Sequence, residues 1–141
     1  MNKRTLALSL AAAATLLVGG AAFGHGDVTP QAVNTEGLAP VGKEWLASNP
    51  YRKNDKALKI GDSAYNQNCA RCHGLEAISG GIAPDLRLLP LGDEGDEIFK
   101  ERVINGAVRN GRVYMPRMGD YISQEGLWAI RTYLESRHSD E

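Results

Sequence analysis

The chain has 141 residues, of which 43% are hydrophobic and 23% charged, enough for a short leader and one globular domain. Sixteen basic and seventeen acidic residues give a formal net charge of −1. This balance argues against a protein that uses its charge to bind nucleic acid or an anionic membrane surface.

Residues 1–24 have the features of a secretory signal peptide. Two basic residues precede an apolar run over 6–18, and small residues at 22–24 form a site of the kind that signal peptidase cleaves. Because the apolar run is shorter than the about 20 residues of a spanning helix, we expect export to the periplasm, cleavage after Gly24 and no stable membrane insertion afterwards. The alternative is an uncleaved anchor. The mature chain would hold fourteen basic and seventeen acidic residues, a net charge of −3.

Residues 25–55 show little periodicity and contain several turn-forming residues, three of them prolines. They also contain Trp45 and Tyr51, aromatic side chains that a solvated tail seldom needs. We therefore expect an irregular N-terminal extension that lies across the globular part. The alternative is a flexible leader.

From residue 56 the apolar positions follow a helical rhythm, which opens a domain expected over 56–138. Gly61, Tyr65 and Cys69 lie four residues apart and so share one face of this first helix. A glycine inside a helix costs about 1 kcal/mol relative to alanine. Gly61 therefore indicates that another helix approaches closely at this point.

The first helix ends at Cys69-Ala70-Arg71-Cys72-His73, a run that contains both cysteines of the chain. This spacing is typical of covalent attachment of a c-type haem, in which each thiol adds to one vinyl group of the porphyrin and the next imidazole binds the iron. We expect one haem c, bound covalently through Cys69 and Cys72, with His73 as an axial ligand of the haem iron.

Three other uses of two cysteines are disfavoured by the rest of the sequence. A structural zinc site normally has four Cys or His ligands, and the two other histidines, His25 and His138, lie near the ends of the mature chain. A thioredoxin-like redox pair follows a buried strand, whereas the residues before Cys69 have a helical rhythm. A disulfide across two residues would close almost no loop and would stabilise little.

A shorter helix is expected over 96–105, after a loop at 88–95, and Gly106 should end it. The acidic residues near its start are interpreted as solvated side chains that the helix dipole favours. They are Asp93, Glu94, Asp96 and Glu97. Asn110-Gly111 predicts a turn, and no strand longer than three or four residues is expected.

The second axial position of the iron would need a ligand or stay open. Methionine is the usual ligand where the task is electron transfer. Met115 precedes Pro116, whose ring disfavours a helix there, and it lies 42 residues after His73, enough chain to reach the opposite face of a porphyrin. We predict Met115 as the second ligand. The alternatives are Met118, His25, His138 or an open site.

The last helix is expected to begin after Ser123, which has a side chain suited to an N-cap. It is the expected partner of Gly61 in a crossing of the first and last helices. Trp128 and Tyr133 are interpreted as core side chains at that crossing. The predicted fold class is all-α, with long loops around a central cofactor.

Together these motifs resemble those of a class I cytochrome c over about residues 56–137. The shared features are the haem motif, the aromatic last helix, Ala83-Pro84-Asp85-Leu86 and Tyr114-Met115-Pro116. Nearly all of the mature chain is also similar to the cytochromes c-550 of quinoprotein (PQQ-dependent) alcohol dehydrogenase systems. The markers of this finer similarity are residues 25–33, 49–52, 64–76, 108–111 and 123–125.

The resemblance implies a class I cytochrome c fold and roles for particular residues. The carbonyl of Pro84 would accept a hydrogen bond from Nδ1–H of His73, which would fix the imidazole and make its other nitrogen more basic. Leu86 and Tyr114 would pack against the porphyrin. Residues 88–95 look shorter than the corresponding loop of some relatives.

The function that follows is a periplasmic one-electron carrier rather than an enzyme. The resemblance implies a PQQ-dependent alcohol dehydrogenase as electron donor, and a downstream cytochrome or terminal oxidase of the respiratory chain as acceptor. The sequence shows no Ser/His/Asp set, paired carboxylates or phosphate-binding loop that would indicate catalysis. Two alternatives stay open: a haem subunit fixed in a dehydrogenase complex, and a haem enzyme or sensor with an exchangeable sixth ligand.

Overall fold

The computed structural model describes residues 29–141, so the expected signal peptide and His25 lie outside the described residues. The helices are α1 (Asp55–Asn68), α2 (Ala70–His73), α3 (Gly92–Asn105) and α4 (Gln124–Ser136). Short 3₁₀ turns occur at Leu75–Ala77, Leu86–Leu88 and Met118–Asp120, and β1 (Ala107–Arg109) pairs with β2 (Arg112–Met115) in an antiparallel hairpin. Within the described residues, no helix is long and apolar enough to cross a membrane.

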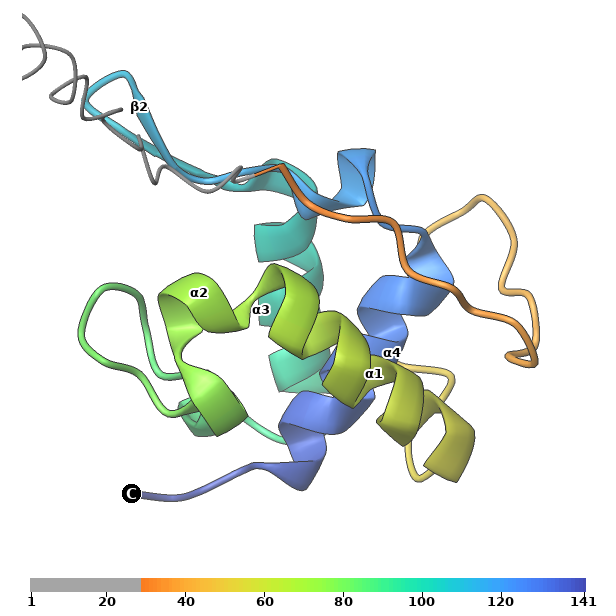
Figure 1. Ribbon diagram of the computed structural model, residues 1–141. Coiled ribbons are helices and arrows are strands. Elements are labelled where there is room, and N and C mark those ends of the chain that lie inside the picture. Colours follow the sequence, from red (N-terminus) through yellow and green to blue (C-terminus); the bar gives the residue numbers. More distant parts are fainter. Residues whose placement is uncertain (1–28) are drawn as a thin grey trace, which may run out of the picture.

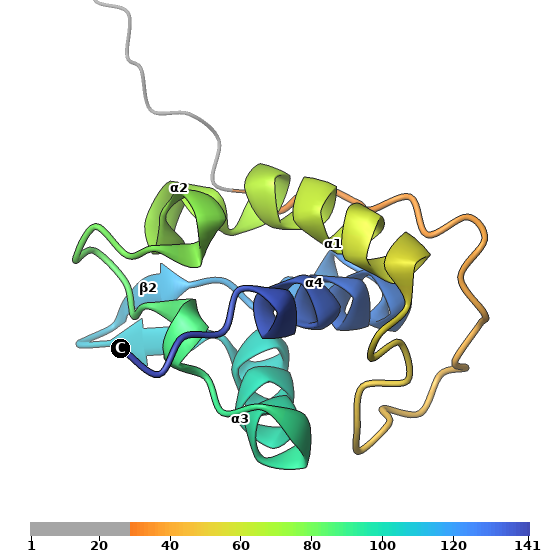
Figure 2. The same ribbon diagram turned by 90° about the horizontal axis from the view of Figure 1, so that it is seen from below.

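The crossing of α1 and α4 forms the centre of the fold, and Figures 1 and 2 show α4 between α1 and α3. A Cβ atom on Gly61 would lie 1.9 Å from the carbonyl oxygen of Ala129, so only glycine allows the two helices to approach this closely. One turn further on, the rings of Tyr65 and Tyr133 are 5.1 Å apart between centroids. Trp128 is wholly buried. The predicted crossing and the core role of its aromatic residues are confirmed.

The ends of these helices follow their capping residues. Asn54 begins α1 by accepting hydrogen bonds from the backbone N–H groups of Lys56 and Ala57, each 3.0 Å long. The Ser123 hydroxyl accepts from the N–H of Gly126 at 3.3 Å and so begins α4, as predicted. Gly106, with a φ of +65°, ends α3, which is also as predicted.

Helix α3 begins at Gly92, four residues before the predicted start, so the expected loop at 88–95 was assigned too long. Two glycines in this stretch gave it the composition of a loop. Gly95 is needed because a Cβ atom there would lie 1.8 Å from the carbonyl oxygen of Pro90. The glycine therefore permits close packing of the first turn, and it does not interrupt the helix.

Asp96 is wholly buried, and the expectation of a solvated side chain was wrong for this residue. Its Oδ1 accepts from Nε of Arg131 at 2.8 Å, and its Oδ2 accepts from Nη2 of Arg52 at 2.6 Å and from the backbone N–H of Asn49 at 2.7 Å. The side chain of Arg131 is only 1% exposed. Asp96 lies beyond the first turn of α3, where the acidic residues are Asp93 and Glu94, and the buried guanidinium of Arg131 on α4 decides where its carboxylate lies.

Residues 29–54 form an irregular segment that passes around the ends of α1 and α4 (orange to yellow in Figure 1). Side chains of α4 accept hydrogen bonds from its backbone: Gln124 Oε1 from the N–H of Leu46 at 2.7 Å, and Glu125 Oε1 from the N–H of Val41 at 3.1 Å. Tyr51 is buried, and its hydroxyl donates to the carbonyl of Ala39. These contacts hold the described part of the extension on α4.

The Asp96–Arg131 pair leads to a prediction about stability. Asp96→Asn should lower the free energy of unfolding by about 3 kcal/mol, because the buried Arg131 would lose its main counter-charge. We place the loss at the lower end of the usual range because Glu135 Oε1 lies 3.5 Å from Nη2 of Arg131. Urea unfolding of the purified protein would measure it.

The matched control is Glu97→Gln, which removes an exposed carboxylate one residue away. It should change the free energy of unfolding by no more than about 0.5 kcal/mol. Equal losses in the two variants would contradict the structural role of Asp96.

Candidate functional site

The Cys-x-x-Cys-His motif forms a tight turn at the end of α1. The N–H of Cys69 bonds to the carbonyl of Tyr65 at 2.8 Å, and the N–H groups of Cys72 and His73 bond to the carbonyl of Cys69 at 3.1 and 3.0 Å. The hydroxyl of Tyr65 donates to the carbonyl of Gly74 at 2.7 Å. Tyr65 therefore links the helix crossing to both ends of the motif.

The two thiols differ in exposure, and neither forms a disulfide: Cys69 is partly buried and Cys72 is exposed. Burial raises the pKa of the Cys69 thiol to about 12, and the neighbouring Cys72 adds to this effect. Redox-active Cys-x-x-Cys pairs have a cysteine with a lowered pKa, because the thiolate is the reactive form. The electrostatics of the motif therefore argue against a thioredoxin-like function.

The imidazole of His73 is oriented by the chain that follows it. Its Nδ1 lies 2.8 Å from the carbonyl oxygen of Pro84, which can only accept a hydrogen bond. Nδ1 therefore carries the proton, and the lone pair is on Nε2. Histidine ligands of metals usually have this arrangement, in which one nitrogen donates to a carbonyl or carboxylate and the other binds the metal.

A salt bridge fixes the loop that presents the Pro84 carbonyl. Asp85 accepts from Nε and Nη2 of Arg87 at 3.1 and 2.8 Å, and from the N–H of Ser79 at 3.3 Å. The hydroxyl of Ser79 donates to the carbonyl of Ala83. The Arg87 guanidinium is the main reason that the pKa of Asp85 is lowered to about 2. The acceptor of the His73 hydrogen bond is therefore held by an ionised carboxylate next to it in the chain.

The two candidate methionines lie in different environments. Met115 is the last residue of β2 and is partly buried against the core, whereas Met118 is buried in the core with 4% of its surface exposed. The register pairs Val113 with Val108 and Met115 with Ala107, and it shifts by one residue between these two pairs, so the hairpin is irregular next to Met115. Figure 2 shows α2 and the hairpin on opposite sides of the same end of the molecule.

The other predicted contact residues lie in this region of the molecule. Leu86 is partly buried against the core, while Tyr114 is 60% exposed and its ring centroid lies 5.5 Å from Cζ of Arg109. The loop after His73 and the hairpin also expose large apolar side chains. These are Leu75, Ile78, Ile82, Leu88, Val108 and Val113.

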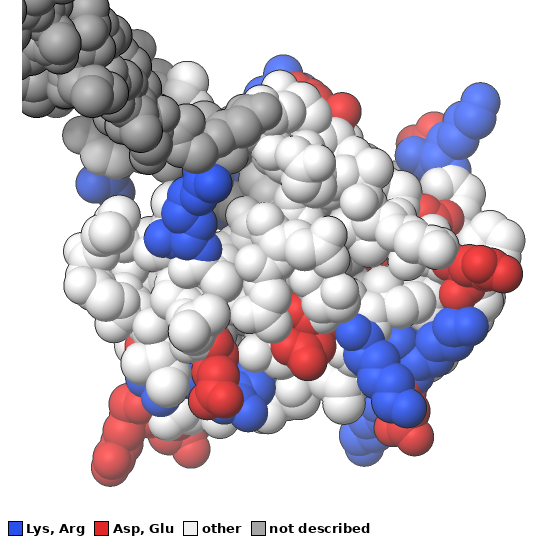
Figure 3. Space-filling model, viewed as in Figure 1, with Lys and Arg blue, Asp and Glu red and all other residues white. Residues whose placement is uncertain are grey.

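This set of groups fits a porphyrin: two thiols at vinyl spacing, an imidazole with a free Nε2, and apolar side chains on both sides. Figure 3 shows that the surface over α2 and the following loop, at the left of the view, consists mostly of uncharged residues. An apolar surface is what a flat, mostly apolar ring requires. The predicted contact between His73 and the carbonyl of Pro84 is present, whereas the Asp85–Arg87 pair was not predicted, although Asp85 belongs to the Ala83-Pro84-Asp85-Leu86 motif.

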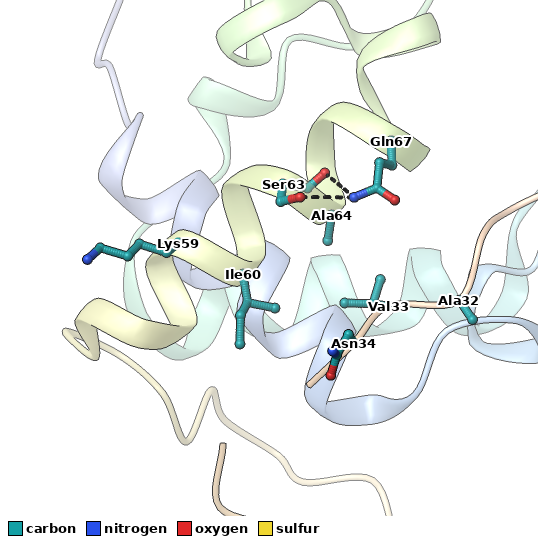
Figure 4. A pocket seen from close by; sticks show the side chains of 8 residues that line it. All are labelled: Ala32, Val33, Asn34, Lys59, Ile60, Ser63, Ala64 and Gln67. Atoms are coloured by element: carbon teal, nitrogen blue, oxygen red, sulfur yellow. Dashed lines mark hydrogen bonds between the residues drawn. The ribbon is translucent and has the colours of Figure 1, made fainter. Parts of the chain in front are cut away.

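A pocket with a volume of about 360 Å³ lies between residues 32–34 of the extension and α1. Figure 4 shows Val33, Ile60 and Ala64 in its lining and the side chain of Lys59 directed away. Nε2 of Gln67 donates to Oγ and to the carbonyl of Ser63, so these polar groups are bonded to each other. The pocket is an open packing groove, and it offers no convergent set of polar groups to a ligand.

Comparisons with known proteins show what this chain is similar to. A family model described as cytochrome c oxidase, cbb3-type, subunit III matches residues 56–134. A protein named cytochrome c550, from Pseudomonas aeruginosa strain PAO1, is 68% identical, and the match covers all of both chains. Two proteins of Pseudomonas putida, quinohemoprotein alcohol dehydrogenases ADH-IIG and ADH IIB, are 36% and 34% identical over 64% and 60% of this chain and 12% of each of theirs. No solved structure gave a significant match.

The Asp85–Arg87 pair makes stability depend on pH in the acid range. The pKa of Asp85 in the folded protein is lowered to about 2, below the about 3.9 of an unfolded chain. Its contribution is therefore fully present above about pH 4 and is lost as the pH falls towards 2. Urea unfolding should show Asp85→Asn to be less stable than the wild type at neutral pH, with the difference shrinking between pH 4 and 2. A difference that stays constant down to pH 2 would contradict this role of Asp85.

Proposed function

This chain belongs to the class I c-type cytochromes, and we propose that it is a periplasmic one-electron carrier between a quinoprotein alcohol dehydrogenase and the respiratory chain. The observation that carries the proposal is the Cys-x-x-Cys-His turn, with His73 oriented by Pro84, in a chain that matches a cytochrome c550 over its full length.

Haem c is the cofactor of this family, and when bound it supplies an iron couple that takes up and releases one electron at a time. Cys69 and Cys72 provide the two thiols for covalent attachment. His73 provides Nε2, and the hydrogen bond from its Nδ1 to Pro84 keeps the ring in one orientation and makes Nε2 a better donor.

We assign Met115 as the second axial ligand. It ends a strand in extended conformation and is partly buried, whereas Met118 is fixed within the core and would have to leave it in order to bind iron. A thioether ligand raises the reduction potential relative to a second imidazole and fills the position that a substrate or gas would need. This ligation suits an electron carrier better than a haem enzyme or sensor.

We also propose that the side chains of Leu86 and Tyr114 contact the porphyrin. The partly buried position of Leu86 supports its contact. Tyr114 directly precedes Met115 in the chain, and its ring lies beneath the guanidinium of Arg109.

Two observations support the donor and the compartment. Segments similar to this chain occur within two proteins named quinohemoprotein alcohol dehydrogenases, which places such a segment in the same molecule as alcohol oxidation in P. putida. The features of a secretory signal in residues 1–24 support a periplasmic location.

The same two enzymes favour a second candidate, a haem subunit held permanently by a dehydrogenase, because the matching segment there is part of the enzyme. The full-length match to a separate chain named cytochrome c550 favours the free carrier. The two candidates differ in kinetics. A free carrier is reduced at a rate that depends on the concentration of the dehydrogenase, whereas a fixed subunit is reduced within its complex.

Stopped-flow mixing of the oxidised, processed haem protein with an alcohol-reduced quinoprotein alcohol dehydrogenase tests the proposal. We expect reduction at a rate proportional to the concentration of the dehydrogenase, since a free carrier must first collide with its donor. Dehydrogenase without alcohol is the control. A protein that dithionite reduces but that the alcohol-loaded enzyme does not reduce would contradict the proposed donor. Elution with the dehydrogenase in size-exclusion chromatography would favour the fixed subunit.

A further inference from the structure

The hairpin of β1 and β2 has two chemically different faces. Its register pairs Arg109 with Arg112 and Val108 with Val113. The ring of Tyr114 lies beneath the guanidinium of Arg109, with its centroid 5.5 Å from Cζ, so Tyr114 adjoins the two paired arginines. We call the surface of Arg109, Arg112 and Tyr114 the Arg–Tyr face.

The positive charge of the Arg–Tyr face is not paired with any carboxylate of residues 29–141. Residues 102–119 contain four arginines and no acidic residue. Arg102 donates to the carbonyl of Gly106, and Arg117 pairs with Asp120 at 3.5 Å. Arg109 and Arg112 are exposed, and neither has a carboxylate at ion-pair distance within residues 29–141. The guanidinium of Arg109 lies over the ring of Tyr114, which orders both side chains.

We propose that the Arg–Tyr face is the surface on which an acidic patch of the donor dehydrogenase docks. The inference rests on the proposed function and names the chemistry of its contact. Uncompensated guanidinium groups pair with carboxylates in a bidentate geometry, and they raise the rate of encounter with a negatively charged surface. Arginine and tyrosine are also the residues that most often dominate the energy of protein interfaces.

The position of this face gives docking there a functional consequence. Tyr114 directly precedes Met115, our assigned iron ligand, in the chain. A partner seated on the Arg–Tyr face would therefore contact the residue next to the ligand. Docking on the extension, which lies around the ends of α1 and α4, would place the partner at a different part of the molecule (Figure 1).

The chain contains a charge-matched control on α1. Lys56 and Lys59 are exposed cations, but Asp55 and Asp62 lie among them on the same helix. Figure 3 shows the resulting mixture of basic and acidic side chains at the lower right of the view. Removing two charges there changes the net charge by the same amount as removing them from the hairpin, and it leaves the Arg–Tyr face intact.

The test compares R109Q/R112Q with K56Q/K59Q in stopped-flow reduction by the alcohol-reduced dehydrogenase at several salt concentrations. At low salt we expect the hairpin variant to react about tenfold more slowly than the wild type and to lose most of the salt dependence. The α1 variant should stay within about twofold of the wild-type rate and keep the salt dependence. The reduction potential of each variant is measured alongside, and the rates are compared at equal driving force.

Each other outcome overturns the proposal. Equal losses in both variants would show that net charge alone controls the encounter. Unchanged rates in both would show that the partner docks elsewhere. If the dehydrogenase reduces the wild type normally in these cases, the proposed function still holds. If it does not reduce the wild type at all, the proposed function fails, and the docking surface assigned to that donor fails with it.

Discussion

The hydrogen bond from His73 to the carbonyl of Pro84 connects the two parts of the chain that build the site. On one side, the imidazole is held by the turn at the end of α1. On the other, the carbonyl is held by a loop that the Asp85–Arg87 pair fixes. With the proton on Nδ1, the only lone pair that the ring can offer is on Nε2. The hydrogen bond therefore fixes the direction of that lone pair in the folded protein.

This geometry depends in turn on the packing of α1 on α4. Gly61 sets how closely the helices approach. One turn later, the ring of Tyr65 packs against that of Tyr133 in a tilted arrangement, and its hydroxyl donates a hydrogen bond to the carbonyl of Gly74. Cys69 follows after one more turn. One face of α1 therefore connects the core to Cys69, where the turn that carries Cys72 and His73 begins. On the other side of α4, the buried charges of Asp96 and Arg131 join α3 and the extension to the same scaffold.

The sequence predicted the parts of the structure that have local signals. Each of these signals is contained in a short stretch of sequence. They are the haem motif, the N-cap at Ser123, the helix end at Gly106 and the spacing of Gly61 and Tyr65. The burial of Asp96 was missed because its partner Arg131 is 35 residues away in the chain. A local signal did exist, since Asp96, Phe99 and Val103 share one face of α3 and all three are buried. The early start of α3 was hidden by Gly92 and Gly95. The contact of Tyr114 with Arg109 depends on the pairing of two strands, which sequence alone did not provide.

The central claim is that His73 and Met115 hold the haem iron between them, and the far-red absorption of the oxidised protein tests it most directly. A sulfur-to-iron charge-transfer band should be present in the wild type and in Met118→Leu, because Met118 is a core side chain for which leucine is a volume-conserving substitute. The band should be absent in Met115→Leu. A band that survives in Met115→Leu and is lost in Met118→Leu would contradict the account and transfer the ligand role to Met118.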